Sequence, residues 1–223
     1  MNLVRRRLFK ARFISRAIAC LPFVRCVILN GSLASGEHKK SSDIDILIIA
    51  EDERIFTARF FVNILAIILG IKRSSDRGKP HAGKFCFNYF LTASFLKIPT
   101  GRGTEMDRYC AQNYSKSQFI AGDIELFKKF MRTNKKLFEK YNCKITNNKS
   151  QISNKILNSK FQILNSVKGG LEYFLTDRFE ILVKNYQVRR IESDPRTKKY
   201  PSLIVYNDRE LRFHPPRVVA RDV

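Results

Sequence analysis

The chain has 223 residues, of which 44% are hydrophobic, so it can bury a sizeable core and wholesale disorder is excluded. Lys and Arg number 42 against 20 acidic residues, which gives a net charge of +22 at pH 7. Such an excess indicates a polyanionic partner, whether nucleic acid, nucleotide or an anionic membrane surface, and says nothing about the fold. The excess is concentrated at the two ends, because the central residues 21–122 carry 14 bases against 9 acids.

The N-terminal residues 3–20 predict an amphipathic helix that ends before Pro22. The same stretch has six basic residues and no acid, a composition also typical of a mitochondrial presequence. The basic residues interrupt its apolar positions, so it is not a secretory signal. The five cysteines form no C-x-x-C pair, and we interpret them as reduced thiols of a cytoplasmic protein rather than as zinc ligands.

The next part of the chain predicts strands around one helix. The expected strands are Phe23–Leu29, Asp43–Ala50 and Phe85–Leu91, and polar stretches at Asn30–Ser42 and 72–84 are typical of loops. Between the second and third strands, acidic residues at 51–53 are expected to begin a helix that runs to about Leu69, because carboxylates are favoured at a helix N-terminus.

This helix is apolar nearly all round, so it lies in a core or in a subunit interface, and an oligomer through residues 54–69 is one expectation. Its most apolar window spans about a dozen residues. A bilayer needs about 20. We therefore expect no transmembrane segment.

The second half of the chain is predominantly helical in pattern. Residues 93–122 show no clear period; after them, helices are expected at Asp123–Tyr141, Ser153–Leu164 and Leu171–Arg190, with a linker at 147–150, a charged turn at Asp194–Lys199, a late strand at Leu203–Tyr206 and a frayed tail at 215–223. This order predicts an α+β domain at residues 1–122 and a mainly helical C-terminal region at residues 123–223. The first helix of that region carries six bases, which either contact nucleic acid or form a solvated face: Lys128, Lys129, Arg132, Lys135, Lys136 and Lys140.

The most informative stretch is VILNGSLASGEHKKSSDIDILIIA, residues 27–50. A strand leads into Gly31-Ser32, where a glycine lets backbone N–H groups approach a phosphate and the hydroxyl adds a donor. Asp43 and Asp45 follow on the next strand, where side chains two residues apart face the same way, about 7 Å apart. Two such carboxylates can hold one or two Mg²⁺ ions, whereas an apolar strand otherwise gains nothing from two adjacent like charges. The alternative is a hairpin with two exposed aspartates.

This pattern resembles the nucleotidyltransferases of the DNA-polymerase-beta type: an apolar strand, Gly-Ser, a spacer of around ten residues, then Asp-x-Asp. The resemblance covers roughly residues 20–95. It implies a small mixed sheet flanked by helices that binds a nucleoside triphosphate with Mg²⁺, Mn²⁺ being an alternative. Asp43 and Asp45 would hold the metals, and an acceptor hydroxyl would attack the α-phosphorus and release pyrophosphate. The nucleotide-binding candidates are Gly31, Ser32, Lys39, Lys40 and Ser42, although the two lysines are also explained as solvated loop charges.

The sequence departs from the pattern of active members, which usually place a third carboxylate on a later strand. On Phe85–Leu91 the matching polar residue is Asn88, whose amide can ligate a metal but cannot act as a base at neutral pH. Either Asn88 is a weakened catalytic ligand, or Glu105 or Asp107 completes the site, or the acceptor arrives activated.

The expected function is therefore Mg²⁺-dependent transfer of an NMP group from an NTP to an unknown acceptor. The alternative is a catalytically inactive, antitoxin-like regulator that binds nucleotide or nucleic acid. A basic nucleic-acid-binding protein without a nucleotide site is a third interpretation.

Overall fold

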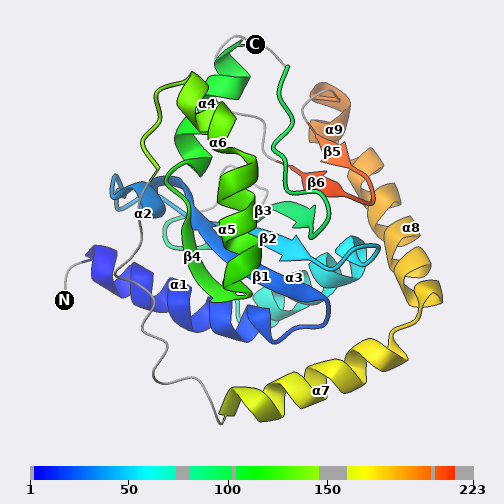
Figure 1. The fold of residues 1–223 in the computed structure, drawn as a ribbon. Coiled ribbons are helices and arrows are strands. Elements are labelled where there is room, and N and C mark those ends of the chain that lie inside the picture. Colours follow the sequence, from blue (N-terminus) through cyan, green and yellow to red (C-terminus); the bar gives the residue numbers. More distant parts are fainter. Residues whose placement is uncertain (1–2, 74–80, 102–103, 146–159, 202–203, 214–223) are drawn as a thin grey trace.

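The computed structural model describes residues 3–73, 81–101, 104–145, 160–201 and 204–213, and its centre is a mixed sheet with the strand order β4-β1-β2-β3-β6-β5 (Figure 1). The strands are β1 (Val24–Asn30), β2 (Ile44–Ala50), β3 (Phe85–Thr92), β4 (Gln118–Gly122), β5 (Val205–Tyr206) and β6 (Glu210–Arg212). Only β2 and β3 pair in parallel, and the other neighbours are antiparallel.

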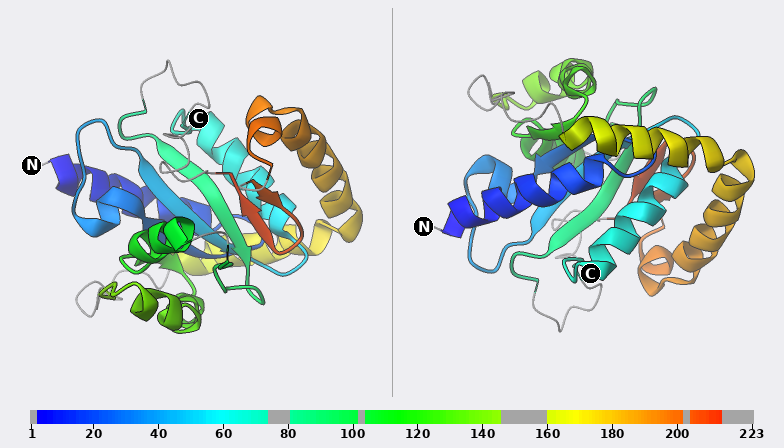
Figure 2. Two further views of the ribbon diagram at one scale, coloured as in Figure 1. Left: turned by 90° about the horizontal axis from the view of Figure 1, so that it is seen from above. Right: turned by 90° about the horizontal axis from the view of Figure 1, so that it is seen from below.

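Helices cover both faces of this sheet (Figure 2). On one face, α1 (Leu3–Ala19) and α3 (Ile55–Ile68) share a core with alternate residues of β1 and β2, and α8 (Asp177–Ser193) packs against α3. On the other face, α4 (Thr104–Tyr114), α5 (Ile124–Thr133) and α6 (Lys135–Lys140) form a second core with the remaining residues. Because both faces are buried, β1 and β2 are apolar almost throughout.

The predicted α+β fold, with a small mixed sheet flanked by helices, is confirmed, and the three predicted strands lie within a residue of their observed ends. The patternless stretch 93–122 contains α4 and the edge strand β4, which pairs with β1. The late strand is followed by β6, which pairs with β3, so residues after 123 also contribute to the sheet. The division at residue 122 stays a prediction.

Four helical details differ from expectation. The stretch Asn30–Ser42 is not all turn, because the short helix α2 (Gly31–Ser35) begins directly after β1. The expected helix Asp123–Tyr141 is two helices, because buried Asn134 between them donates to Leu96 O at 2.8 Å and accepts from Ile98 N at 2.8 Å. The charged turn at 194–199 contains α9 (Pro195–Lys199). The expected helix Leu171–Arg190 is divided between the end of α7 (Lys160–Phe174) and α8, and residues 153–159 of the expected helix Ser153–Leu164 lie outside the described residues.

The N-terminus of α3 is stabilised by a distant residue. The expected acids at 51–53 precede the helix, whose first turn has none. Instead, buried Glu180 of α8 accepts from Phe56 N at 3.0 Å and Thr57 N at 2.8 Å. A carboxylate at this position accepts hydrogen bonds from two backbone N–H groups that have no partner within the helix, and its charge interacts favourably with the helix dipole.

The C-terminal end of α3 is exposed, with Ile67 63% and Ile68 75% accessible. An oligomer through this helix stays a prediction. No helix in the described part of the chain is long and apolar enough to cross a membrane. The expected linker at 147–150 and tail at 215–223 lie outside the described residues.

Candidate functional site

The end of β1 and the start of β2 bring the Gly31-Ser32 turn against the paired acids. The antiparallel register places Asn30 opposite Asp45, so the residue after Asn30 lies beside that carboxylate. Gly31 has φ +67°, and a Cβ at this position would overlap the Asp45 carboxylate. Glycine is therefore required both by the backbone conformation and by the close approach.

A cysteine completes the cluster around the two acids. Parallel pairing sets Cys86 of β3 opposite Asp45, and one ligand atom each from Asp43, Asp45 and Cys86 lie within 4.8 Å of one another. Asp43 is 7% and Cys86 8% exposed. Burial, followed by the charges of the two carboxylates, raises the pKa of Cys86 far above its ordinary value, so the sulfur is a thiol. Cys86 was expected to be a core thiol; it is buried, but it faces the acids.

A guanidinium also lies in this cluster. Nη1 of Arg73 is 2.5 Å from Oδ2 of Asp43 and 3.7 Å from Sγ of Cys86. The ion pair compensates the buried charge of Asp43. This contact could not be predicted from the sequence, because Arg73 lies in a polar loop 30 residues after Asp43.

Asn88 lies at an irregularity of β3. Ile46 of β2 pairs with Phe87 and Leu47 pairs with Tyr89, so Asn88 is the extra residue of a bulge. Bulges re-aim neighbouring side chains, and here both Asn88 and Tyr89 line the same cavity as the acids.

Ser32 contacts a histidine that is itself hydrogen-bonded to an arginine. Ser32 Oγ lies 3.1 Å from Nδ1 of His38, and Nη1 of Arg7 in α1 hydrogen-bonds Nε2 of the same ring. Because arginine only donates, Nε2 must accept, which places the proton of the neutral ring on Nδ1. His38 therefore donates to Ser32, whose own hydroxyl hydrogen is left to donate elsewhere. Burial, then the charge of Arg7, lowers the pKa of His38, although Asp43 opposes this.

Arg7 also fixes the loop that carries the two candidate lysines. It donates to the carbonyl oxygens of Lys39 at 2.9 Å, Lys40 at 2.6 Å and Ser42 at 3.1 Å. His38, in the same loop, is part of this network. Arg7 was not singled out in the sequence, since a basic helix position carries no sign of a contact with residues more than 30 positions away.

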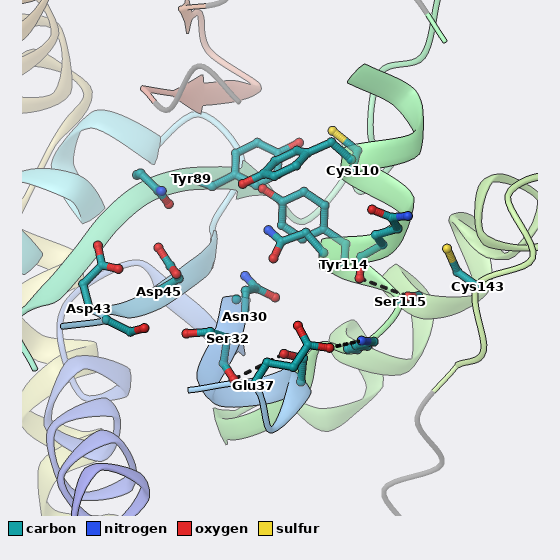
Figure 3. A pocket seen from close by; sticks show the side chains of 18 of the residues that line it. Asn30, Ser32, Glu37, Asp43, Asp45, Tyr89, Cys110, Tyr114, Ser115 and Cys143 are labelled. Atoms are coloured by element: carbon teal, nitrogen blue, oxygen red, sulfur yellow. Dashed lines mark hydrogen bonds and ion pairs between the residues drawn. The ribbon is translucent and has the colours of Figure 1, made fainter. Parts of the chain in front are cut away.

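A cavity of about 920 Å³ lies beside the two acids and the glycine turn (Figure 3). Figure 3 shows Asp43, Asp45 and Ser32 along one side of the pocket and Tyr89 and Tyr114 across from them. The predicted residues that line it are Gly31, Ser32, Lys39, Ser42, Asp43, Asp45 and Asn88. Among the described residues, the lining does not include Lys40, Glu105 or Asp107. The Asp107 carboxylate accepts from Gly101 N at 3.0 Å instead.

The donor set fits a divalent cation. Two converging carboxylates with a glycine turn beside them offer hard oxygen ligands of the kind that Mg²⁺ and Mn²⁺ prefer. The sulfur of Cys86 lies at the same point, but a protonated thiol does not ligate a metal, so the donors are the two carboxylates.

The mixed sheet thus carries paired acids beside a glycine turn at the edge of one cavity. A comparison with known protein families indicates which kind of domain has this arrangement. Residues 15–89, about a third of the chain, match the family model described as a nucleotidyltransferase domain. This match confirms the resemblance of the Gly-Ser and Asp-x-Asp pattern to nucleotidyltransferases.

No curated protein matches the chain. Among solved structures, one described as "Crystal structure of the toxin-antitoxin with AMP-PNP" is 17% identical, with a TM-score of 0.32; the match covers 59% of this chain and 85% of that chain.

Proposed function

We propose that this protein is a divalent-cation-dependent nucleotidyltransferase that moves an NMP group from a nucleoside triphosphate to the hydroxyl of an acceptor. The observation that carries the proposal is the convergence of Asp43 and Asp45 beside the Gly31-Ser32 turn inside one cavity. In the reaction, a bond forms between the acceptor oxygen and the α-phosphorus, the bond from that phosphorus to pyrophosphate breaks, and the hydroxyl proton passes to solvent.

Each group has a role that follows from its contacts. Ser32 would donate its hydroxyl hydrogen to a phosphate oxygen, because His38 already donates to Ser32. Lys39 lines the cavity and would neutralise the triphosphate. Asp43 and Asp45 would hold the cation, with Cys86 or Asn88 nearby on β3. A bound cation would supply charge stabilisation to the attacking and leaving oxygens.

The test compares nucleotide binding and transfer in the wild type and the Asp43→Asn/Asp45→Asn variant. Titration calorimetry with a non-hydrolysable NTP and Mg²⁺ should show tight binding by the wild type and at least a tenfold loss in the variant. Unfolding curves establish that the variant is folded. Unchanged affinity in a folded variant would refute the role of these acids. Incubation with labelled NTPs, Mg²⁺ and a cell lysate then tests transfer, since the label becomes covalent on an acceptor.

A second candidate is a catalytically inactive protein that binds nucleotide as a regulator. The Arg73–Asp43 ion pair favours it, because a guanidinium neutralises a carboxylate that a cation needs. The lack of a carboxylate at Asn88 points the same way. In this case the wild type binds the NTP without transferring label, and its binding is independent of Mg²⁺.

A further inference from the structure

A buried arginine lies in the cavity, far along the chain from every residue assigned above. Arg212 of β6 is 6% exposed and lines the cavity. Its charged neighbour is Glu210, whose Oε1 lies 3.5 Å from Nη1 of Arg212, long for a hydrogen bond. Nη2 of Arg212 is buried and has no hydrogen-bond partner among the described residues. Because a buried guanidinium nitrogen is costly to leave unpaired, this geometry indicates a site for an anion.

The sheet register places Arg212 on the same face as the acids. Asp45 pairs with Cys86, Leu47 with Tyr89, and Tyr89 in turn with Arg212. Arg212 is therefore two strands and two residue rows from Asp45, on the order of 12 Å away at the usual strand spacings. That distance is too long for a ligand of the same cation and short enough for the far end of one bound molecule.

The strand order indicates whether the nucleoside triphosphate or the acceptor lies beside Arg212. The Gly31-Ser32 turn follows β1, the acids belong to β2, and Arg212 belongs to β6 on the opposite side. In a phosphoryl displacement, the attacking and leaving oxygens lie on opposite sides of the phosphorus. With pyrophosphate leaving over the Gly31-Ser32 turn, the acceptor approaches from the β3–β6 side.

We propose that Arg212 binds an anionic group, a phosphate or a carboxylate, on the acceptor whose hydroxyl is modified. The acceptor is thus an acidic molecule, which agrees with the forked guanidinium geometry that suits both groups. The assignment to the acceptor side rests on the proposed nucleotidyltransferase function. The anion site itself rests only on the burial and position of Arg212.

The test measures anion binding in variants of the buried Glu210–Arg212 pair. Inorganic phosphate and acetate are titrated into the wild type, Glu210→Gln and Glu210→Gln/Arg212→Gln, without nucleotide and with a saturating non-hydrolysable NTP and Mg²⁺. Arg209→Gln, on the exposed part of the same hairpin, is the matched control. We expect Glu210→Gln and Arg209→Gln to bind phosphate or acetate at least as tightly as the wild type does. The double variant should bind the preferred anion at least tenfold more weakly, with an unchanged affinity for the Mg²⁺–NTP.

Each outcome is decisive. Preference for phosphate or for acetate identifies the anionic group on the acceptor. Equal anion affinity in Glu210→Gln and the double variant overturns the anion site. If the double variant is unfolded, Glu210→Leu/Arg212→Met, which replaces the buried pair with apolar side chains, repeats this comparison. A parallel loss of NTP affinity in the double variant would place Arg212 on the triphosphate and overturn the acceptor assignment. If Asp43→Asn/Asp45→Asn leaves NTP binding intact, the proposed function fails and the acceptor assignment with it, whereas the anion site is unaffected.

Discussion

Replacing Gly31 with alanine should disturb the candidate site. Gly36, directly after the same helix, provides a control with a similar backbone conformation. Gly31 has φ +67° and Gly36, directly after α2, has φ +83°. An alanine in this left-handed region costs roughly 1–2 kcal/mol at either position. The two positions differ in their surroundings: a Cβ at Gly36 meets nothing within 4 Å, whereas at Gly31 it overlaps the Asp45 carboxylate.

The difference between the two variants therefore measures the contact with Asp45. Relieving the overlap forces Asp45 out of its rotamer, at about 0.5–1.5 kcal/mol. We expect Gly36→Ala to lower the free energy of unfolding by about 1–2 kcal/mol and Gly31→Ala by about 2–3 kcal/mol. Denaturant unfolding of both variants, analysed with a common slope, measures these values.

Cation binding should separate the two variants further. Asp45 displaced from Asp43 loses cation affinity, and each 1.4 kcal/mol corresponds to about tenfold. Calorimetric titration with Mn²⁺ should show roughly a tenfold loss for Gly31→Ala and wild-type affinity for Gly36→Ala. Equal stability losses in the two variants, or an unchanged Mn²⁺ affinity in Gly31→Ala, would refute the close approach of Gly31 and Asp45 as the reason for glycine.

Three further perturbations test other parts of the site and core. Arg73→Gln removes the cation that pairs with Asp43, so Mn²⁺ affinity should rise by about tenfold or more in calorimetry; a fall would mean that Arg73 orients the carboxylate for binding. The pKa of His38 is lowered in the folded protein, so the unfolded chain protonates this ring at a higher pH, and the free energy of unfolding should fall as the pH drops below the ordinary pKa of 6.5. Unfolding curves at several pH values should show a smaller fall for His38→Gln than for the wild type. The same pH dependence in both proteins would contradict this role of His38. Asn134→Ala leaves the buried Ile98 N–H unpaired, so the free energy of unfolding should drop by about 2–4 kcal/mol, with Asn185→Ala in α8 as the exposed control; a loss under 1 kcal/mol would show that water replaces the amide.

The predictable part of the molecule is its central sheet and motif. Strands buried on both faces leave continuous runs of Val, Ile and Leu in the sequence, as at residues 44–50. Gly31, Ser32, Asp43 and Asp45 lie on two consecutive elements, so their proximity follows from one antiparallel pairing. Short-range pattern was sufficient to place them together.

Contacts between distant segments could not be predicted, because they depend on tertiary packing and not on local sequence. Tertiary packing brings three such residues to the site: Arg7, Arg73 and Cys86. Nothing in the local sequence distinguishes an arginine that binds another side chain from a solvated one, or a cysteine that faces two acids from a core cysteine. Glu180 takes the role expected of the acids at 51–53, because a helix terminus accepts a carboxylate from any element packed against it.

Short strands at the edge of the sheet were also not apparent in the sequence. β4 and β6 have five and three residues, too few for two-residue alternation to stand out from a loop. β6 nevertheless delivers Arg212 to the cavity, so the part of the chain with the weakest pattern adds a charged group to the site.

The alternation of β2 ties the site to the stability of the fold. Ile44, Ile46 and Ile48 belong to one core, and Leu47 belongs to the other. Asp45, two residues before Leu47, shares its face, where Cys86 and the cavity lie. A slip of one residue in the pairing of β1 with β2 would turn Asp45 toward the isoleucine core, where an ionised carboxylate has no compensation. The same hydrophobic burial that holds the sheet together therefore fixes the acids at the glycine turn, and no separate interaction is needed to select that register.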